Sequence, residues 1–416
     1  MKVLIVNHYA YAPFQHGGVR HFMLAKELQR LGHETLIVST SFFHKSQSET
    51  RLEPGEKHRL ETIDGVRFLW LKTPPYKGNG VGRIRNMLSF AWQVLRRSGF
   101  PSDFAPDVVY SSSPQLLSSL AAERLARKLG VPHVFEIRDL WPQTFVDLGN
   151  WSPSHPWIRM LDLIQRHLYR RADHVVSTLP SAAPYIVEHG GRKEAITWIT
   201  NGIDLREAPE PKPLADNGRP FVLAHAGVHA VSTGLDVALD AAGILIAKGR
   251  GADIEFVFWG SGPEKARQLN RIENEGLTNV VFHDPVPKSE IHDKLAVADG
   301  FLLTRAPSPI HRWGISPHKL ADYFAAKRPV VFSVDSEWNP VAEVNAGTTA
   351  LPGDAASLAD AIVRLVDTPV DERRSMAERG YDFMKSEMEI RILGSRLERV
   401  LKSVVIDTRS QGIPGS

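Results

Sequence analysis

The sequence predicts an α/β protein made of two doubly wound domains, each with a mainly parallel sheet. Short apolar strands alternate with segments of helical periodicity along the first 200 residues. A polar segment follows at 201–218, and the same alternation restarts at residue 219. A chain of 416 residues is long enough for two domains of ordinary size, so each half can bury its own core.

Residues 1–200 are predicted to form the first domain. The stretch "KVLIVNHY" has the apolar run of a buried strand, and apolar residues follow it at helical spacing, at Phe22, Met23, Leu28 and Leu31. Gly32 is typical of a helix end, and "TLIVST" begins a second strand. Such a strand, helix, strand unit implies a parallel sheet with right-handed crossovers. Further strands are indicated by "PDVVYSSS", "VPHVFEIRD" and "ADHVVSTLP".

The second half repeats the pattern after a linker. Residues 201–218 are rich in Pro, Asp and Asn, which predicts an interdomain linker. Residues 219–385 are predicted to form the second domain, with strands at "FVLAHAG", "IEFVFWGSG", "VVFHDPV", "GFLLTRA" and "RPVVFS". Residues 386–405 are predicted to form a terminal helix with one apolar face, and residues 406–416 a flexible tail.

Composition excludes several classes of protein. The formal net charge of +3 is small for this length, so no nucleic-acid partner is expected. The chain has no cysteine, which excludes disulfides, thiolate metal sites and cysteine nucleophiles. The histidines lack the spacing of metal ligands, so no metal site is expected. No window approaches the roughly 20 apolar residues of a spanning helix, and the first residues do not resemble a secretory signal. We expect a cytoplasmic protein.

The stretch "GISPHKLADYFAAKRPVV", residues 314–331, reads as a turn, a short helix and a strand. Ligands of doubly wound sheets bind at the carboxyl ends of the strands, here in a central cleft between two facing domains. Ser316 is a good N-cap, the amides of the first helical turn attract an anion, and Lys319 adds a positive charge. Asp322 can accept two hydroxyl hydrogen bonds from a ribose. The alternative is a capped surface helix with an ion pair between Lys319 and Asp322.

Glycines mark two further turns. Gly260 and Gly262 follow an apolar strand, where they would let a ligand approach the backbone, although a tight turn without a ligand needs the same residues. Gly17 and Gly18 precede the first crossover helix, where they would admit a phosphate or a sugar. The full G-x-G-x-x-G pattern is missing, which disfavours a nicotinamide-binding domain.

Charged residues end one of the predicted buried strands. Glu136, Arg138 and Asp139 lie in "FEIRDLWPQ", at the point where that strand stops. Charged groups at a strand end often belong to a site, and the alternative is a local salt bridge.

Residues 77–97, "KGNGVGRIRNMLSFAWQVLRR", carry five basic and no acidic side chains among apolar ones. A basic helix with an aromatic-rich apolar side can lie on an anionic membrane, which predicts peripheral membrane contact. The alternative is a helix packed on the first domain with its basic side chains in solvent.

These motifs together resemble family 4 of the retaining glycosyltransferases, which have the GT-B architecture of two Rossmann-like domains. The resemblance covers nearly the whole chain, and its most specific part is "SPHKLADYFAAKRPVVFS". It also rests on the Gly17-Gly18 pair and on "GHETLIVST", "PDVVYSSSP", "FEIRDLWP", "ITNGIDL", "FWGSGPEK" and "GLTNVVFHDPVP". Within the family, the chain is most similar to bacterial enzymes of surface-polysaccharide synthesis, including transferases of the fucosamine type.

The resemblance implies a nucleotide-sugar donor in the second domain and an acceptor in the first. Asp322 matches the second acid of the family's Glu-x7-Glu motif and would hold the ribose, and Val286 matches the position that meets the base. Lys319 and Arg305 would stabilise the leaving diphosphate, together with Ser316. The other donor contacts implied are Gly227, His229, Gly260, Gly262, Gly314, Ile315 and Leu320. Arg138 or Asp139 would orient the acceptor, and the remaining acceptor-side residues are Gly17, Gly18, Ser113 and Glu136.

Three positions depart from the family pattern. Gly314 stands where the motif has its first acid, so the usual carboxylate contact to the donor sugar is absent. The lysine that many members carry after the first strand of the second domain is missing from "GVHAVSTGLD". Serines 111–113 replace the histidine often found after "PDVV".

The sequence therefore predicts a retaining, metal-independent glycosyltransferase without a cofactor. It would move a sugar from a UDP-sugar to a glycan or polyprenyl-linked acceptor in cell-surface polysaccharide synthesis, at the inner face of the cytoplasmic membrane. Two alternatives stay open: a non-catalytic binding or scaffold subunit of the same fold, and a nucleotide-sugar epimerase or a phosphorylase of the same architecture.

Overall fold

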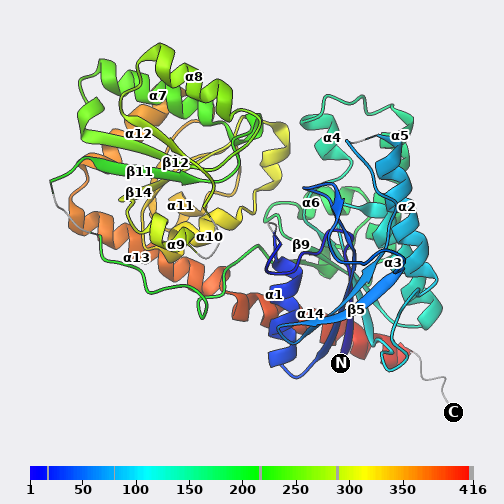
Figure 1. Ribbon diagram of the computed structural model, residues 1–416. Helices are drawn as coiled ribbons and strands as arrows, with labels where there is room; N and C mark the ends of the chain where they lie inside the picture. Colours follow the sequence, from blue (N-terminus) through cyan, green and yellow to red (C-terminus); the bar gives the residue numbers. More distant parts are fainter. Residues whose placement is uncertain (16–17, 79, 215–217, 287–289, 412–416) are drawn as a thin grey trace. The chain divides into compact units, whose positions relative to one another are not determined.

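The protein is described by a computed structural model that covers residues 1–15, 18–78, 80–214, 218–286 and 290–411 (Figure 1). The chain divides into two compact units. Unit 1 comprises Met1–Thr200 and Ile390–Ser416, and unit 2 comprises Asn201–Glu389. No helix in the described part of the chain is long and apolar enough to cross a membrane.

Unit 1 is built on an eight-stranded sheet in the order β10-β9-β8-β7-β1-β2-β6-β5. All neighbours are parallel except β5, which is antiparallel to β6. A short antiparallel pair, β3 and β4, lies outside this sheet. The strands are β1 (Lys2–Val6), β2 (Glu34–Thr40), β3 (Phe42–Phe43), β4 (Ser48–Glu49), β5 (His58–Ile63), β6 (Val66–Leu71), β7 (Val108–Ser112), β8 (His133–Ile137), β9 (His174–Ser177) and β10 (Ile196–Trp198).

Helices cover both faces of this sheet. Alternate residues of β1 face opposite ways: Val3 and Ile5 pack with α1 and α14, whereas Leu4 and Val6 pack with α2 and α3. The two resulting cores explain why the central strands are continuously apolar. The helices are α1 (Arg20–Arg30), α2 (Val81–Leu95), α3 (Leu116–Leu129), α4 (Gln143–Asp147), α5 (Pro156–Arg171), α6 (Ala183–Glu188), the 3₁₀ turn η1 (Lys193–Ala195) and α14 (Ile390–Gln411).

The terminal helix α14 packs on unit 1 beside α1, and Leu393, Leu397 and Leu401 of α14 are fully buried there (Figure 1). It differs from the predicted helix at both ends, because it starts at Ile390 and runs to Gln411. The tail was predicted to start at residue 406, but residues 406–411 are part of the helix. Val404 and Val405 are the last buried residues of the predicted helix, and beyond its predicted end Arg409 pairs with Asp107 at 2.8 Å.

Unit 2 is built on a six-stranded, fully parallel sheet in the order β13-β12-β11-β14-β15-β16. Its strands are β11 (Phe221–Ala226), β12 (Ile254–Trp259), β13 (Val280–His283), β14 (Gly300–Thr304), β15 (Val330–Ser333) and β16 (Gly347–Thr349). One apolar core lies under α7 and α12 and another under α10 and α13. The helices are α7 (Leu235–Ala247), α8 (Lys265–Glu275), α9 (Ile291–Leu295), α10 (His318–Ala325), α11 (Pro340–Glu343), α12 (Ala355–Asp367) and α13 (Val370–Glu387), with 3₁₀ turns η2 (Val231–Thr233), η3 (Gly251–Asp253) and η4 (Pro309–Trp313).

The beginning of the predicted linker is part of unit 2. The Ile203 amide donates to the Met388 carbonyl at 3.0 Å, and the Ile203 side chain is buried in the core under α10 and α13. The Asn201 amide donates to the Ser316 hydroxyl at 2.9 Å, and Asn201 Nδ2 donates to the Ser316 carbonyl at 2.7 Å. The Pro-rich composition of 201–218 does not reveal these contacts, because they use backbone groups, the Asn201 amide side chain and the apolar Ile203 side chain.

Candidate functional site

The loops at the carboxyl ends of the unit 2 strands are bonded to one another. The Gly227 amide, directly after β11, donates to the Trp259 carbonyl at 2.8 Å, and the His229 amide donates to the Ser261 carbonyl at 2.9 Å. The loop after β11 therefore lies against the loop after β12. This edge of the sheet also carries Arg305, directly after β14.

Three predicted glycines lie in this arrangement, and each is needed for a close approach of protein groups. A Cβ at Gly260 would come within 1.8 Å of the Gly227 carbonyl oxygen, and a Cβ at Gly262 within 2.1 Å of the His229 carbonyl oxygen. A Cβ at Gly227 would lie 2.3 Å from Lys319 Nζ. Gly260 and Gly262 thus admit the neighbouring loop's backbone, which is the tight-turn alternative of the sequence analysis.

Lys319 lies in the first turn of α10, with its amine beside Gly227. The amine is 3.1 Å from Nε2 of His225, a fully buried residue of β11. A second bond joins the same two elements, because the Ala226 amide donates to the Tyr323 hydroxyl of α10 at 3.1 Å. The helix that carries Lys319 and Asp322 is thereby fixed against the end of β11.

The charges at this edge are partly desolvated. Burial lowers the pKa of Lys319 to about 7, with the positive charge of Arg305 acting in the same direction and the Asp322 carboxylate opposing it. Burial also lowers the pKa of Arg305 from its ordinary value. Two cations that repel each other and are removed from water would be stabilised by a bound anion.

Several buried polar atoms of unit 2 have no hydrogen-bond partner among the residues that the structure describes, and two of the residues, His229 and His311, interact with Lys319 and Arg305 respectively. The His229 ring is fully buried, with both nitrogens unpartnered, and burial lowers its pKa to about 4. Three other buried atoms also lack a hydrogen-bond partner among the described residues: Asn201 Oδ1, beside Ser316, and Ser308 Oγ and His311 Nδ1, in the segment after β14. Buried polar groups are normally satisfied, so such a group of atoms indicates a place for a ligand or water.

The turn before α10 differs from its prediction. Pro317 occupies the N-cap position and makes no side-chain cap bond. Ser316 was expected there, but its hydroxyl accepts the Asn201 amide instead. Gly314 has φ of +89°, a conformation that favours glycine, so the local backbone itself disfavours an acid at this position. Ile315 and Leu320 are buried in the core, where they support the turn.

The remaining predicted donor and acceptor positions lie on loops. Val286, after β13, is partly buried against the core under α10. Gly18 is partly buried in the loop before α1, and Gly17 lies outside the described residues.

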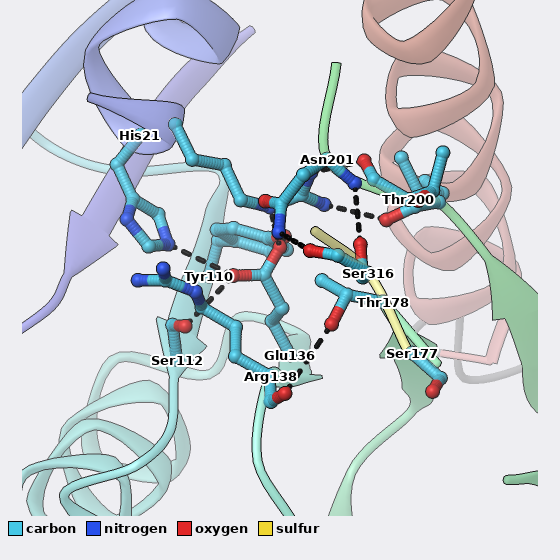
Figure 2. Close-up of polar contacts among 12 residues, drawn as sticks. His21, Tyr110, Ser112, Glu136, Arg138, Ser177, Thr178, Thr200, Asn201 and Ser316 are labelled. Atoms are coloured by element: carbon cyan, nitrogen blue, oxygen red, sulfur yellow. Dashed lines mark hydrogen bonds and ion pairs between the residues drawn. The ribbon is translucent and has the colours of Figure 1, made fainter. Parts of the chain in front are cut away.

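In unit 1, Glu136 is the centre of a fully buried polar cluster (Figure 2). Arg20 Nε and His21 Nε2, from the start of α1, lie 2.8 and 2.9 Å from its two carboxylate oxygens. The hydroxyls of Tyr110 and Ser112, from β7, donate to the same carboxylate. Arg20 also donates to the Thr200 carbonyl and, at 2.8 Å, to the Ile199 carbonyl.

The neighbouring positive charges keep Glu136 ionised, as the partner of Arg20. Burial alone would raise the pKa of Glu136, but Arg20, His21 and Arg138 hold it well below its ordinary value. Burial lowers the pKa of His21 despite the carboxylate, which leaves Arg20 as the counter-charge. The carboxylate of Glu136 is therefore bonded within the protein, to Arg20 and His21 of α1, and not to a neighbour at the strand end as in the local salt-bridge alternative.

Ser113, Arg138 and Asp139 lie together next to this cluster. The Ser113 hydroxyl accepts the Arg138 amide at 2.8 Å and the Asp139 amide at 3.3 Å. Asp139 is exposed and Arg138 is partly buried, with Nε unpartnered among the described residues. These two side chains are therefore more accessible than the Glu136 carboxylate.

Three residues of these clusters escaped the sequence analysis. They are His225 of β11 and Arg20 and His21 of α1, for which no role was predicted. A signal exists for each, because a histidine interrupts the apolar strand "FVLAHAG" and an Arg-His pair follows directly on Gly17-Gly18-Val19. Polar residues at buried positions need partners, and those partners come from distant segments.

Comparisons with known proteins agree with this architecture. A family model described as "Glycosyl transferase 4-like domain" matches residues 17–202, and one described as "Glycosyl transferases group 1" matches residues 219–368. Together the two models span most of the chain.

One curated relative is the 2-deoxystreptamine glucosyltransferase of Streptomyces kanamyceticus, which is 27% identical over 274 residues. The match covers 61% of this chain and 66% of that enzyme, so the chain spans just under two thirds of its relative's length.

Solved structures share the fold at low identity. HepE of Anabaena, in complex with UDP and glucose, has a TM-score of 0.65 at 15% identity, with 97% of this chain and 100% of that chain covered. WaaG, a glycosyltransferase involved in lipopolysaccharide biosynthesis, has a TM-score of 0.65 at 15% identity, with 96% and 99% covered. The predicted GT-B fold class is confirmed. The chain belongs to the GT-B glycosyltransferases, with a glycosyl transferase 4-like domain in its first half and a glycosyl transferases group 1 domain in its second.

Proposed function

We propose that the protein transfers a sugar from a nucleotide-sugar donor bound at the carboxyl ends of the unit 2 strands. The observation that carries this is the pair of partly desolvated cations, Lys319 and Arg305, among buried polar atoms without partners in the described chain. A nucleoside diphosphate supplies the negative charge and hydrogen-bond acceptors that such a group of residues needs.

In this proposal the bond between the sugar's anomeric carbon and the diphosphate breaks, and a bond from that carbon to an acceptor hydroxyl forms as the hydroxyl loses its proton. Negative charge grows on the departing diphosphate. The Lys319 ammonium, the Arg305 guanidinium and the amides of the first turn of α10 would stabilise it. Asp322, one turn along α10, would accept the ribose hydroxyls. Retention of configuration and independence of metal rest on the family resemblance.

UDP is the nucleotide we propose, since the HepE complex of the same fold contains UDP and glucose. Val286 would meet the base. With Gly314 in place of the first motif acid, the donor sugar lacks that carboxylate contact, and His229, with two unpartnered ring nitrogens among the described residues, is the group we propose to take its place.

For the acceptor we propose a glycan or polyprenyl-linked sugar of cell-surface polysaccharide synthesis, oriented by Arg138 and Asp139. WaaG, which shares the fold, is involved in lipopolysaccharide biosynthesis. Glu136 would act indirectly, because its carboxylate accepts from Arg20, His21, Tyr110 and Ser112. Ser113 would hold the Arg138 and Asp139 backbone in place.

The surface of α2 supports membrane contact for such an acceptor. Met87, Phe90 and Val94 face the core, whereas Val81, Leu88 and Trp92 are 81%, 53% and 56% exposed. Exposed Arg85 and Arg96 lie on the same stripe, with Arg96 stacked 4.4 Å from the Trp92 ring. The sequence has no acidic residue between Asp64 and Asp103, so this face suits an anionic lipid surface.

Calorimetric titration with UDP and GDP tests the donor site. We expect UDP to bind the wild type and to bind Asp322→Ala and Lys319→Met at least about tenfold more weakly, since each removes a charged contact. Lys327→Met is the matched control, because this lysine lies two residues after the end of α10 and pairs with Glu378 at 2.8 Å. Binding of neither nucleotide, or equal binding by all variants, would contradict the proposed donor site.

Turnover separates transfer from the alternatives. Release of free UDP that requires both a UDP-sugar and a lipid-linked acceptor is the expected result. Conversion of the UDP-sugar to an isomer without release of UDP would favour an epimerase, and donor binding without transfer or hydrolysis would favour a scaffold subunit.

Co-sedimentation with vesicles tests the α2 surface. We expect binding to vesicles that contain anionic lipid, weakened by salt and by Arg85→Glu with Arg96→Glu. Lys128→Glu with Arg159→Glu is the control, since both residues are exposed and lie on α3 and α5. Indifference to salt and to the α2 substitutions would remove the proposed membrane contact.

A further inference from the structure

The histidine that touches Lys319 has a defined hydrogen-bonding role. His225 Nδ1 lies 3.0 Å from the Leu302 carbonyl oxygen of β14, and Nε2 lies 3.1 Å from Lys319 Nζ. A carbonyl oxygen only accepts, so Nδ1 carries the proton. In the neutral ring Nε2 then has a lone pair, which accepts a hydrogen bond from the Lys319 ammonium.

We propose that His225 is a positioning residue that holds the Lys319 ammonium over Gly227 for the donor's diphosphate. This inference rests on the proposed function, because it assumes that the diphosphate binds at Lys319. His225 itself lies in the buried strand and acts through Lys319.

A neutral imidazole suits this role better than a carboxylate. A carboxylate would orient the amine equally well but would neutralise its charge, leaving little attraction for a phosphate. The imidazole accepts one hydrogen bond and leaves the positive charge in place. Burial and the neighbouring Lys319 both keep the pKa of His225 well below its ordinary value, so the ring stays neutral.

The surroundings fix the histidine firmly. His225 is fully buried, its ring is edge-on to Phe258 at 6.2 Å, and β11 lies between β12 and β14 in the sheet. The charged groups that act on the pair are Arg305, after β14, and Asp322, on α10, with His229 nearby on the loop after β11. The Asp322 carboxylate attracts the Lys319 ammonium electrostatically, and the hydrogen bond to His225 sets the orientation of that ammonium.

The test compares a ligand that has the diphosphate with one that lacks it. For His225→Ala we expect the Kd for UDP to rise about tenfold or more and the Kd for uridine to change by less than about twofold. Combined with Lys319→Met, His225→Ala should add little, since both act through one ammonium. Equal losses for UDP and uridine, or additive effects in the double variant, would overturn the proposal.

A second measurement needs no variant. Nitrogen shifts of the His225 ring in ¹⁵N-histidine-labelled wild type should show the neutral form with the proton on Nδ1 at about pH 7.5. A proton on Nε2 would overturn the pairing, because that nitrogen would then donate. If the wild type binds neither UDP nor GDP, the proposed function fails on its own, and the ring tautomer still tests the His225–Lys319 pair.

Discussion

The charged groups buried at the carboxyl ends of the two sheets have different kinds of partner. In unit 1 the charges find partners inside the protein: the Glu136 carboxylate accepts from four side chains, and the Arg20 guanidinium donates to Glu136 and to two backbone carbonyls. In unit 2 Lys319 and Arg305 repel each other in a partly desolvated place, and the His229 ring lacks a partner among the described residues.

This difference separates structure from function. A buried ion pair with all its hydrogen bonds made has little left to offer a ligand, and it holds neighbouring elements in register. Lys319 has the Asp322 carboxylate as an opposing charge, but Arg305 repels it, and an anion bound beside both cations would stabilise them. Glu136 is a charged residue at a strand end and Lys319 one at a helix start, and only their partners in the structure distinguish their roles.

Of the substitutions predicted here, removal of the Glu136 carboxylate should cause the largest loss of stability. Glu136→Ala leaves the Arg20 charge buried without its counter-ion, and we expect a loss of about 3–5 kcal/mol in the free energy of unfolding. Urea denaturation measures it. The protein that stays folded should bind UDP with unchanged affinity.

The control for this substitution is Glu34→Ala, which removes a largely solvated partner of Arg67 and Lys2 and should change stability by less than about 1 kcal/mol. A small loss of stability for Glu136→Ala would contradict the structural role of this cluster, and loss of UDP binding in the folded protein would assign it a role in the donor site.

Displacing the Lys319 amine should weaken the donor site about tenfold to a hundredfold. The Cβ added by Gly227→Ala would lie 2.3 Å from Nζ, so the amine must move. Gly276→Ala is the control, since Gly276 also has a positive φ, +63°, but a Cβ there meets nothing within 4 Å. Titration with UDP measures both. Comparable losses in the two variants would mean that backbone strain, and not the amine, determines the result.

The affinity for UDP should depend on pH through Lys319. Its pKa is about 7 in the free protein, and the protonated form binds the diphosphate. Affinity should therefore be nearly constant below about pH 7 and fall by up to about tenfold per unit above it, until the higher pKa of the complex is reached. Arg305 stays charged over this range, and His225 and His229 are already neutral.

Calorimetry between about pH 6 and about pH 9 measures this dependence, and Lys319→Met should abolish it. An affinity that is flat or rises with pH in the wild type would place the diphosphate elsewhere.

Much of the fold follows from local pattern. Strand and helix periodicity predicted both parallel sheets, because burial on both faces requires continuous apolar strands. The hairpin of β5 and β6 was missed, although Asp64-Gly65 between Ile63 and Val66 is a strong two-residue turn signal and both turn residues have positive φ. The end of α14 also differs from the prediction, because the helix continues from residue 406 to Gln411 and Arg409 pairs with Asp107, a contact that the polar composition of the tail does not reveal.

The site is less predictable, because it depends on which distant groups meet. Lys319 and the glycines stand out locally, but nothing near Lys319 in the sequence predicts His225, 94 residues earlier. Gly260 is a close-approach residue as expected, yet the approaching group is the Gly227 carbonyl. Local sequence can therefore indicate that space is needed, while tertiary contacts decide what fills it.

Ser316 tests whether a polar group at the start of α10 is bonded within the protein or left for the ligand. Its substitution should have the smallest effect on stability and on UDP affinity. The family resemblance implies that its hydroxyl faces the diphosphate, whereas in the structure the hydroxyl accepts the Asn201 amide at 2.9 Å. Ser316→Ala should then lower the free energy of unfolding by about 1 kcal/mol, the usual loss for one hydrogen bond, and leave the Kd for UDP within about twofold. Urea denaturation and UDP titration of the same samples measure both quantities. Unchanged stability with weaker UDP binding would instead place Ser316 with Lys319, among the groups whose partner is the ligand, and the anchor at Asn201 would then depend on the Ser316 carbonyl alone.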